Sequence, residues 1–324
     1  MKANNCGHEW IVSLTQQEEE SDLDTSLVQV IYDLLEVKNF AIYINKHFDA
    51  QIAAQLINKN TTLEQLSAEE SLRLVEKLNE NKVRITKQSD KVITYIPAYH
   101  FGKVIGVIII ETDEELPDRV TMLAVHILNI YANHLSLLYK SRQDPLTELL
   151  NRQTFDKKVM EIVSGNGFLE PRSDSKDTRN WYLAIIDIDH FKNVNDNFGH
   201  VIGDEVILLV AQLLKNNFRL EDYVFRYGGE EFAVLFQVNS EQECNIALDR
   251  LRTNISQYMF PQVGHLTISI GFLELKNMDT VSSIVNQADL ALYHSKNTGR
   301  NKVTPYSDLD VSEEVTTDNS IELF

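Results

Sequence analysis

The sequence predicts two α/β domains joined by a long helix. Strand-like apolar runs alternate with helix-like amphipathic runs along most of the 324 residues, and this alternation favours layers of sheet and helix. A helical stretch with two apolar stripes, residues 117–143, separates the two halves. The length also suits two domains, because a typical domain has ~100–200 residues.

The first half predicts a short leader followed by an α/β domain. Residues 1–20 end in an acidic run and are expected to be a flexible leader. In the predicted domain, residues 21–116, an opening helix is followed by a strand at 40–44. A further helix is expected from Ser67, since Ser67 and Glu70 have the spacing of a capping box.

Two β-rich runs at residues 92–96 and 104–110 predict a hairpin with a longer loop. This α/β order resembles a GAF or PAS-type sensor domain, and residues 101–111 (FGKVIGVIIIE) resemble the GAF pattern better. The resemblance implies that residues 21–116 bind an unidentified small molecule.

The connecting helix at residues 117–143 has apolar residues at spacings of three and four, which define a coiled-coil seam. Two interpretations stay open: both stripes pack on the first domain, or one forms a homodimer interface. The stripes are Leu123, Ile127, Ile130 and Leu137, and Leu128, Tyr131, Leu135 and Leu138.

Composition excludes several classes of protein. The formal net charge of −18 argues against a nucleic-acid binder, because phosphate backbones are bound through clustered Lys and Arg. Cys6 and Cys244 form no disulfide framework or zinc motif. Polar residues interrupt the longest apolar helix, so no membrane span is expected, and no secretory signal is visible. We therefore expect a cytoplasmic protein with a disordered acidic tail at residues 307–324.

The second domain, residues 144–306, predicts a sheet covered by helices, with one tight hairpin. The expected elements are helix 147–163, polar loop 164–180, strand 181–187, helix 203–217, hairpin 223–237, helix 241–258, strand 265–275 and helix 281–296.

Two carboxylates stand at the end of the predicted strand. Asp187 and Asp189 are two positions apart, so in a regular strand they point to the same face. Charges at the end of an apolar strand are costly unless they are paired or bind metal. By itself the pattern also fits a helix cap or a strand-end salt bridge.

The run RYGGEEF, residues 226–232, places two more acids beside it. Gly228 and Gly229 between β-rich runs predict a hairpin turn, because such turns need positive φ. Glu230 and Glu231 follow and point to opposite faces of a regular strand, so one of them could join Asp187 around a hard cation such as Mg2+.

At these residues the chain resembles the GGDEF family of diguanylate cyclases, in a GGEEF form. The resemblance runs through residues 144–152, 187–196, 199–204, 226–232 and 296–301. It implies a palm-like nucleotidyl cyclase domain that binds one GTP per subunit. It also implies that Asp187, Glu230 and Glu231, with the Ile188 carbonyl, hold Mg2+ or Mn2+, and that Glu230 accepts the proton of the reacting 3′-hydroxyl.

The resemblance assigns the remaining substrate contacts. Asn195 and Asp204 would bind guanine, Phe191 and Lys192 would line the phosphate pocket, and Lys296 and Arg300 would bind the β- and γ-phosphates. From the residues alone, Asn195 also fits a turn, Asp204 a helix cap near Gly203, and Lys296 a favourable position at a helix C-terminus.

Arg219 and Asp222 have the spacing of the family's RxxD inhibitory site, which binds cyclic di-GMP, with Arg250 as a secondary contact. The expected function is therefore the condensation of two GTP into cyclic di-GMP by a homodimer, regulated by the first domain. A catalytically silent receptor for GTP or cyclic di-GMP is the alternative. A cyclase with another product, such as cyclic GMP-AMP, is disfavoured by Asp204, which suits guanine.

Overall fold

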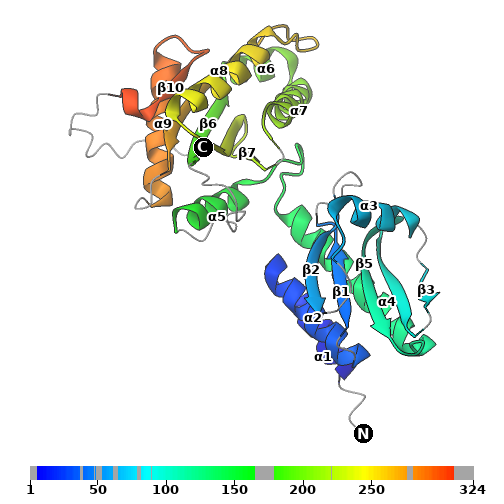
Figure 1. Cartoon of the computed structure of the whole chain (residues 1–324). Helices are drawn as coiled ribbons and strands as arrows, with labels where there is room; N and C mark the ends of the chain where they lie inside the picture. The colour runs from blue at the N-terminus through cyan, green and yellow to red at the C-terminus, as the bar shows by residue number, and fades with distance from the viewer. Residues whose placement is uncertain are drawn as a thin grey trace. The chain divides into compact units, whose positions relative to one another are not determined.

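The computed structural model describes residues 6–36, 39–46, 48, 53–60, 65–78, 82–88, 90–164, 179–219, 221–275 and 280–309. The chain divides into two compact units, Met1–Ser141 and Arg142–Phe324 (Figure 1). Each unit has its own sheet and hydrophobic core. Most of the expected acidic tail lies outside the described residues.

The first unit is an antiparallel sheet with helices on both faces. Its strand order is β2-β1-β5-β4-β3. The strands are β1 (Phe40–Ile44), β2 (Gln55–Asn60), β3 (Arg84–Lys87), β4 (Val92–His100) and β5 (Lys103–Thr112); the helices are α1 (Cys6–Thr15), α2 (Glu20–Leu35), α3 (Ala68–Lys77) and α4 (Asp118–Ser141).

Several local expectations for this unit are confirmed. The capping box at Ser67 and Glu70 is formed at the start of α3. The hairpin of β4 and β5 is present, but its loop is shorter than expected: His100 pairs with Lys103, and the two residues between them, Phe101 and Gly102, have φ values of 40° and 84°.

The expected flexible leader is wrong for the residues that the structure describes there. Cys6–Thr15 forms α1, in which Leu14 is fully buried and Trp10 packs on the core. This helix contacts α2 and α4 on one face of the sheet, whereas α3 covers the other face. Apolar residues at helical spacing therefore outweighed the acidic composition of the segment.

Helix α4 is an integral part of the first unit. Leu128, Tyr131 and Leu135 are fully buried, and the Tyr131 hydroxyl donates to Asp24 Oδ1 at 2.6 Å. The other predicted stripe is divided, since Ile127 is buried whereas Leu137 is 64% exposed. Among the described helices, α4 alone is long and apolar enough to cross a membrane by length and composition, and one of its faces packs on the core of the first unit.

The second unit is a mixed sheet with strand order β10-β9-β6-β8-β7. Strand β6 lies at its centre and is antiparallel to both β8 and β9, while β10 is parallel to β9. The strands are β6 (Asn180–Ile188), β7 (Tyr223–Arg226), β8 (Glu231–Val238), β9 (Ile268–Glu274) and β10 (Val303–Pro305); the helices are α5 (Arg152–Val163), α6 (Phe191–Phe198), α7 (His200–Asn217), α8 (Glu241–Gln257) and α9 (Val281–Asn297), followed by a short 3-10 helix, Tyr306–Asp308.

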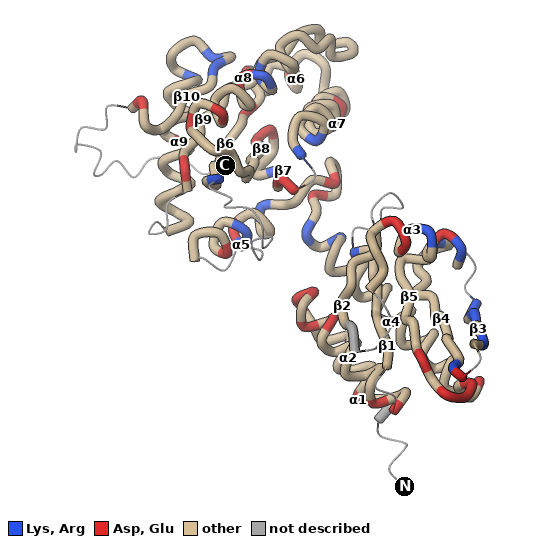
Figure 2. Tube along the Cα trace, in the orientation of Figure 1, with Lys and Arg blue, Asp and Glu red and all other residues tan. Residues whose placement is uncertain are grey.

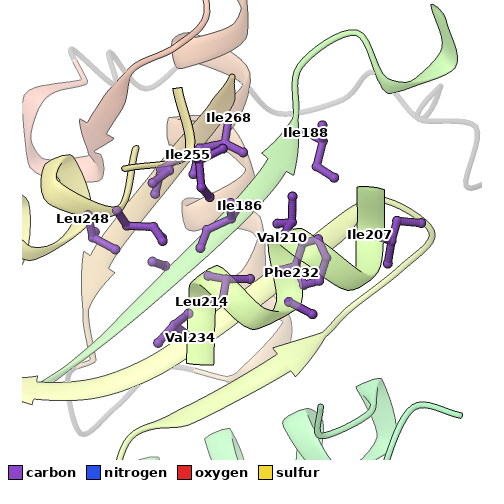
Figure 3. Packing of buried hydrophobic residues seen from close by; sticks show 14 of the residues in the cluster. Ile186, Ile188, Ile207, Val210, Leu214, Phe232, Val234, Leu248, Ile255 and Ile268 are labelled. Atoms are coloured by element: carbon purple, nitrogen blue, oxygen red, sulfur yellow. The ribbon is translucent and has the colours of Figure 1, made fainter. Parts of the chain in front are cut away.

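Alternating residues of β6 separate two cores. Ile186 and its equivalents face α6, α7 and α8, and Figure 3 shows this packing, in which Phe232 of β8 and Val210 of α7 belong to one cluster. Ile185 and its equivalents face α5 and α9. Asp187 has the parity of Ile185, so it lies on the α9 side of the sheet.

The helical expectation for residues 203–217 was too short. Two helices are present, α6 and α7, separated by Gly199 with φ 82°. Helix α7 begins at His200, so Asp204 lies inside the helix and does not cap it. The first helix was expected too early, because it begins at Arg152, where the Asn151 side chain accepts from Thr154 N. Most of the expected polar loop lies outside the described residues.

Candidate functional site

The centre of the site is a charged group where β6, β8 and α9 meet. Asp187 and Glu231 are direct partners in the register of β6 and β8. Lys296, in the last turn of α9, places its Nζ 2.8 Å from Asp187 Oδ2. Acidic residues on β8 and α9 are marked in Figure 2. Asp187 is only 7% exposed, whereas the Lys296 side chain is 30% exposed, so this ion pair is buried mainly on its carboxylate side.

Burial and neighbouring carboxylates make the charged form of Asp187 unfavourable. Burial raises the pKa of Asp187 to about 6, and the charges of Glu230 and Glu231 act in the same direction, against the opposing effect of Lys296. Partial desolvation and the Glu231 charge likewise raise the pKa of Asp289, on α9, to about 6. The group therefore has excess negative charge that one lysine does not neutralise.

The glycine turn has a different physical basis from the one expected. Gly228 and Gly229 do join β7 and β8, but neither has a positive φ. A Cβ atom at residue 228 would lie 2.6 Å from Glu231 Oε2, whereas one at residue 229 would meet open space. Gly228 therefore makes room for the Glu231 carboxylate, which folds back over the turn.

Arg226 and Asp144 hold this turn in place. The Arg226 guanidinium donates to both carboxylate oxygens of Asp144 at 3.1 Å and to the Gly229 carbonyl at 3.0 Å. Although partial burial opposes it, hydrogen bonds from Thr147 and Arg226 keep the pKa of Asp144 below its usual value. Asp144, near the start of the second unit, is thus connected to Arg226, 82 positions later beside the turn.

Asp187 and Asp189 do not share a partner. Strand β6 ends at Ile188, and the Asp189 carboxylate, 3% exposed, accepts from Ser269 Oγ and Thr267 Oγ1. It also accepts from the backbone N–H of Asn301 at 2.9 Å. Asp189 is therefore held at the strand end by neutral partners, through hydrogen bonds in place of the salt bridge or helix cap considered from the sequence.

The residues expected to bind the base lie on α6 and α7. A Cβ atom at Gly203 would lie 2.1 Å from Asn195 Oδ1, so the Asn195 amide packs directly on the α7 backbone. Asp204 follows Gly203, and its side chain is exposed rather than packed in the core. Phe191 is buried against the core, whereas Lys192 is exposed.

The ends of α9 and of α7 hold the remaining predicted residues. Gly299, with φ 117°, follows α9, so Lys296 lies in the last turn and Arg300 just beyond it, as expected. At the RxxD segment, Asp222 accepts from the Arg219 amide at 2.8 Å and partial burial raises its pKa. Arg250 donates to the Asn217 carbonyl at 3.0 Å, at the end of α7.

The carboxylates can fit a divalent cation that is shared with a substrate. Among the described residues, no three His, Cys, Asp or Glu side chains are grouped closely enough to hold a metal on their own. Mg2+ usually takes one or two protein carboxylates and completes its shell with water and substrate phosphates. Asp187 opposite Glu231 matches this donor set, and their unneutralised charge favours a cation.

Comparison with known proteins identifies the second unit. Residues 141–302, half of the chain, match the family described as "Diguanylate cyclase, GGDEF domain". The chain belongs to the GGDEF family. Within the GGDEF domain, the sequence run GGEEF at residues 228–232 is the turn and strand start described above.

Individual relatives share this domain. Diguanylate cyclase DgcP of Pseudomonas aeruginosa is 34% identical over 167 residues, which are 51% of this chain and 24% of that protein. Diguanylate cyclase A of Treponema denticola is 31% identical over 221 residues, 65% of this chain and 58% of that protein. The chain thus spans less than two thirds of either relative.

A solved structure has the same fold in this region. The coiled coil and GGDEF domain of DgcB from Caulobacter crescentus, determined in complex with c-di-GMP, is 30% identical and covers 58% of this chain and 97% of that one, with a TM-score of 0.50. The second unit therefore has the fold of this GGDEF domain.

The sequence did not indicate the roles of Arg226 and Asp289, or the partners of Asp189. Arg226 was quoted only as part of a motif, and its contact with Asp144 needs residues far apart in the chain. Asp289 gave no signal, because an acid on a helix usually faces solvent. Asp189 was recognised as an acid at the strand end, but its partners on β9 and after α9 were not predictable from spacing.

Proposed function

We propose that the protein is a diguanylate cyclase that joins two GTP molecules into cyclic di-GMP and releases two pyrophosphates. The observation that carries the proposal is the pair Asp187 and Glu231, opposite each other beside the glycine turn, with Lys296 bound to Asp187. Membership of the GGDEF family and similarity to curated diguanylate cyclases support it.

In this proposal Asp187, Glu230 and Glu231, with the Ile188 carbonyl, hold Mg2+ or Mn2+. The metal would stabilise the negative charge of the triphosphate and of the leaving pyrophosphate. Lys296 now neutralises Asp187 and would move to the β- and γ-phosphates with Arg300. Phe191 and Lys192 would line the phosphate pocket at the start of α6.

The protein groups then position and deprotonate the substrate. The 3′-oxygen of one GTP attacks the α-phosphorus of the other, the bond to pyrophosphate breaks, and the 3′-hydroxyl proton passes to the Glu230 carboxylate. Asn195 and the Asp204 carboxylate would bind guanine, which donates from N1–H and N2–H. Adenine has no donor at N1. A wrong base would leave the Asp204 carboxylate without its donors, which costs ~1–3 kcal/mol.

Two substrates on two subunits must face each other, so the proposal includes a homodimer. Leu137 and Leu123, exposed on α4, are the surface we assign to that dimer. The antiparallel sheet of the first unit, with helices on both faces, supports its assignment as a GAF-like sensor for a small molecule that regulates the dimer. Since GTP is a cytoplasmic nucleotide, the proposal implies a cytoplasmic domain.

The RxxD segment is proposed as the site where the product inhibits the enzyme. Arg219 is exposed, and so is Arg250 of α8, which donates to the Asn217 carbonyl at the end of α7. A guanidinium binds phosphate through two parallel hydrogen bonds, and the Asp222 carboxylate can accept from guanine. The DgcB structure in complex with c-di-GMP supports the assignment of cyclic di-GMP as a ligand of the family.

The deciding experiment is incubation with GTP and Mg2+ followed by chromatography of the products. The wild type should form cyclic di-GMP, and Glu230→Gln should lose at least about a hundredfold in turnover, the usual contribution of a general base. Glu161→Gln is the matched control, because it alters only a surface ion pair on α5. A Glu230→Gln protein that binds GTP but turns over at the wild-type rate would refute the role assigned to Glu230. A wild-type protein that binds GTP but forms no cyclic di-GMP would favour the silent receptor.

A further inference from the structure

The segment after α9 has an unusual backbone. Three residues in succession have left-handed φ values: 117° at Gly299, 61° at Arg300 and 45° at Asn301. Glycine adopts this region freely, but a non-glycine residue there costs on the order of 1 kcal/mol or more. Two such residues in a row persist only when surrounding contacts hold them, so the turn at Arg300 and Asn301 must be held from outside.

Two contacts hold Asn301 in this conformation. Its backbone N–H donates to Asp189 Oδ2 at 2.9 Å, and its side-chain Oδ1 accepts from Arg252 Nη1 of α8 at 2.8 Å. Arg252 is partly buried, with its side chain 20% exposed, and it also forms an ion pair with Asp249. The Asp189 contact is different, because that carboxylate is 3% exposed and a charge-assisted hydrogen bond is strongest in a dry environment.

Asp189 is itself fixed by the sheet. Its amide donates to the Thr267 carbonyl, its Oδ2 accepts from Thr267 Oγ1 at 2.6 Å, and its Oδ1 accepts from Ser269 Oγ at 2.7 Å. Ser269 is also the β9 partner of Asp187 in the register of β6. The strand end that carries Asp187 therefore also fixes the turn that carries Arg300.

We propose that Asp189 is a positioning residue for the phosphate-binding segment. Its buried carboxylate holds the Asn301 amide and thereby fixes the left-handed turn that sets Arg300 relative to Lys296 and Asp187. Asp189 touches no substrate in this role. The inference rests on the proposed GTP site, in which Lys296 and Arg300 bind the β- and γ-phosphates.

The first test needs no nucleotide. Hydrogen exchange is followed at single residues in the full chain, for the wild type and Asp189→Asn. The Asn301 amide should exchange about tenfold faster in Asp189→Asn, which corresponds to about 1.4 kcal/mol, while amides of β6 and β8 keep their wild-type rates. Unchanged exchange at Asn301, or equal acceleration throughout the domain, would overturn the inference.

The second test separates phosphate binding from folding. The ligands are 3′-deoxy-GTP and 3′-deoxy-GMP, which lack the attacking hydroxyl and so are not consumed. Asp189→Asn should weaken the binding of 3′-deoxy-GTP about tenfold and leave the affinity for 3′-deoxy-GMP within about twofold of the wild-type value. The reason is that only the triphosphate needs Arg300 and Lys296. An equal loss for both ligands, or equal wild-type affinities for the two, would overturn the role.

Thr267 provides a second route if Asp189→Asn does not fold. Thr267→Val removes the hydroxyl that fixes the same Asp189 oxygen and should cause both changes to a smaller extent; Thr267→Ser keeps the hydroxyl and should restore wild-type values. A Thr267→Val protein identical to Thr267→Ser in both tests would contradict the inference. Failure of the proposed function shows itself separately, as a wild type that makes no cyclic di-GMP.

Discussion

Asp187 and Glu231 lie directly opposite each other on the two central strands of the second unit. Like charges in this cross-strand relationship destabilise a sheet, and Asp187 is nearly buried. Lys296 offsets part of this repulsion at 2.8 Å from Asp187. The arrangement stores an electrostatic cost where the proposed cation binds, so the fold and the proposed function have opposite requirements at this point.

The pH dependence of stability should reveal that cost. The pKa of Asp187 is raised to about 6 from its ordinary 3.8, so the folded state binds the proton more tightly than the unfolded state. Its contribution is therefore favourable at low pH and is lost as pH rises from about 4 to about 6, with a change on the order of 3 kcal/mol.

Asp187→Asn removes this titration and should unfold at higher urea concentration than the wild type at pH 7 in EDTA, with a difference that disappears near pH 4. Trp181 fluorescence in a Trp10→Phe background reports on the second unit alone, because the chain has two tryptophans. Identical pH slopes in the two proteins would contradict the raised pKa.

Asp204 should decide the choice of base. It is exposed within α7, so its replacement by Ala has little effect on stability. The ratio of kcat/KM for GTP to that for ATP should fall by about tenfold or more, because the donors of guanine lose their acceptor. Glu205→Ala, which removes the same charge from the next exposed position, should keep the wild-type ratio.

Gly203 should matter because of Asn195. Gly203→Ala improves the helix propensity of α7 by about 1 kcal/mol, but its Cβ would lie 2.1 Å from Asn195 Oδ1. We expect weaker GTP binding with little change in the free energy of unfolding. In an Asn195→Ala background the same change should cost no further affinity, and a double-mutant cycle of GTP dissociation constants measures this coupling. Additive losses would show that the two residues act independently.

Arg219→Ala should relieve inhibition by cyclic di-GMP. Loss of a bidentate guanidinium contact should raise the inhibition constant about tenfold or more, with the initial rate unchanged. Arg219→Lys keeps the charge but not the planar fork, and an intermediate value is expected. Initial rates in the presence of added product provide the measurement, and an unchanged inhibition constant for Arg219→Ala would place the inhibitory site elsewhere.

Leu137→Glu should prevent the proposed dimer without unfolding the first unit, since Leu137 is 64% exposed on α4. Sedimentation should show a monomer, and turnover per chain should fall most at high dilution. Met160→Glu introduces the same charge at a residue of the second unit that is 63% exposed, and it should behave as the wild type. A Leu137→Glu protein that remains dimeric would exclude this face of α4.

Local signals predicted most elements of the chain. Strand β1 was expected at residues 40–44 and is found there, and the capping box at Ser67 was correct, because both depend on neighbouring residues. Helix α6 was not predicted and α7 was expected to begin only at residue 203, since the break between them depends on Gly199 and a change of direction rather than on periodicity. The leader was misjudged because burial of Leu14 depends on α2 and α4.

The same distinction between local signals and contacts among distant elements applies to the candidate site. Resemblance to the family's motifs led to the assignment of Asp187, Glu230, Glu231, Lys296 and Arg300 without any structure. Their relationships did not follow from spacing: the register that sets Glu231 against Asp187, the Gly228 contact with Glu231, and the separate partners of Asp189. Each of these joins residues from different strands or helices.

The amino-acid sequence by itself determined the kinds of residue present, their local secondary structure and the family to which the second unit belongs. Only the tertiary structure decided that Lys296 pairs with the Asp187 carboxylate and that the Asp189 carboxylate holds the turn after α9. The physical reason is that periodicity and capping act over a few residues, whereas burial and ion pairing depend on groups brought together by the sheet.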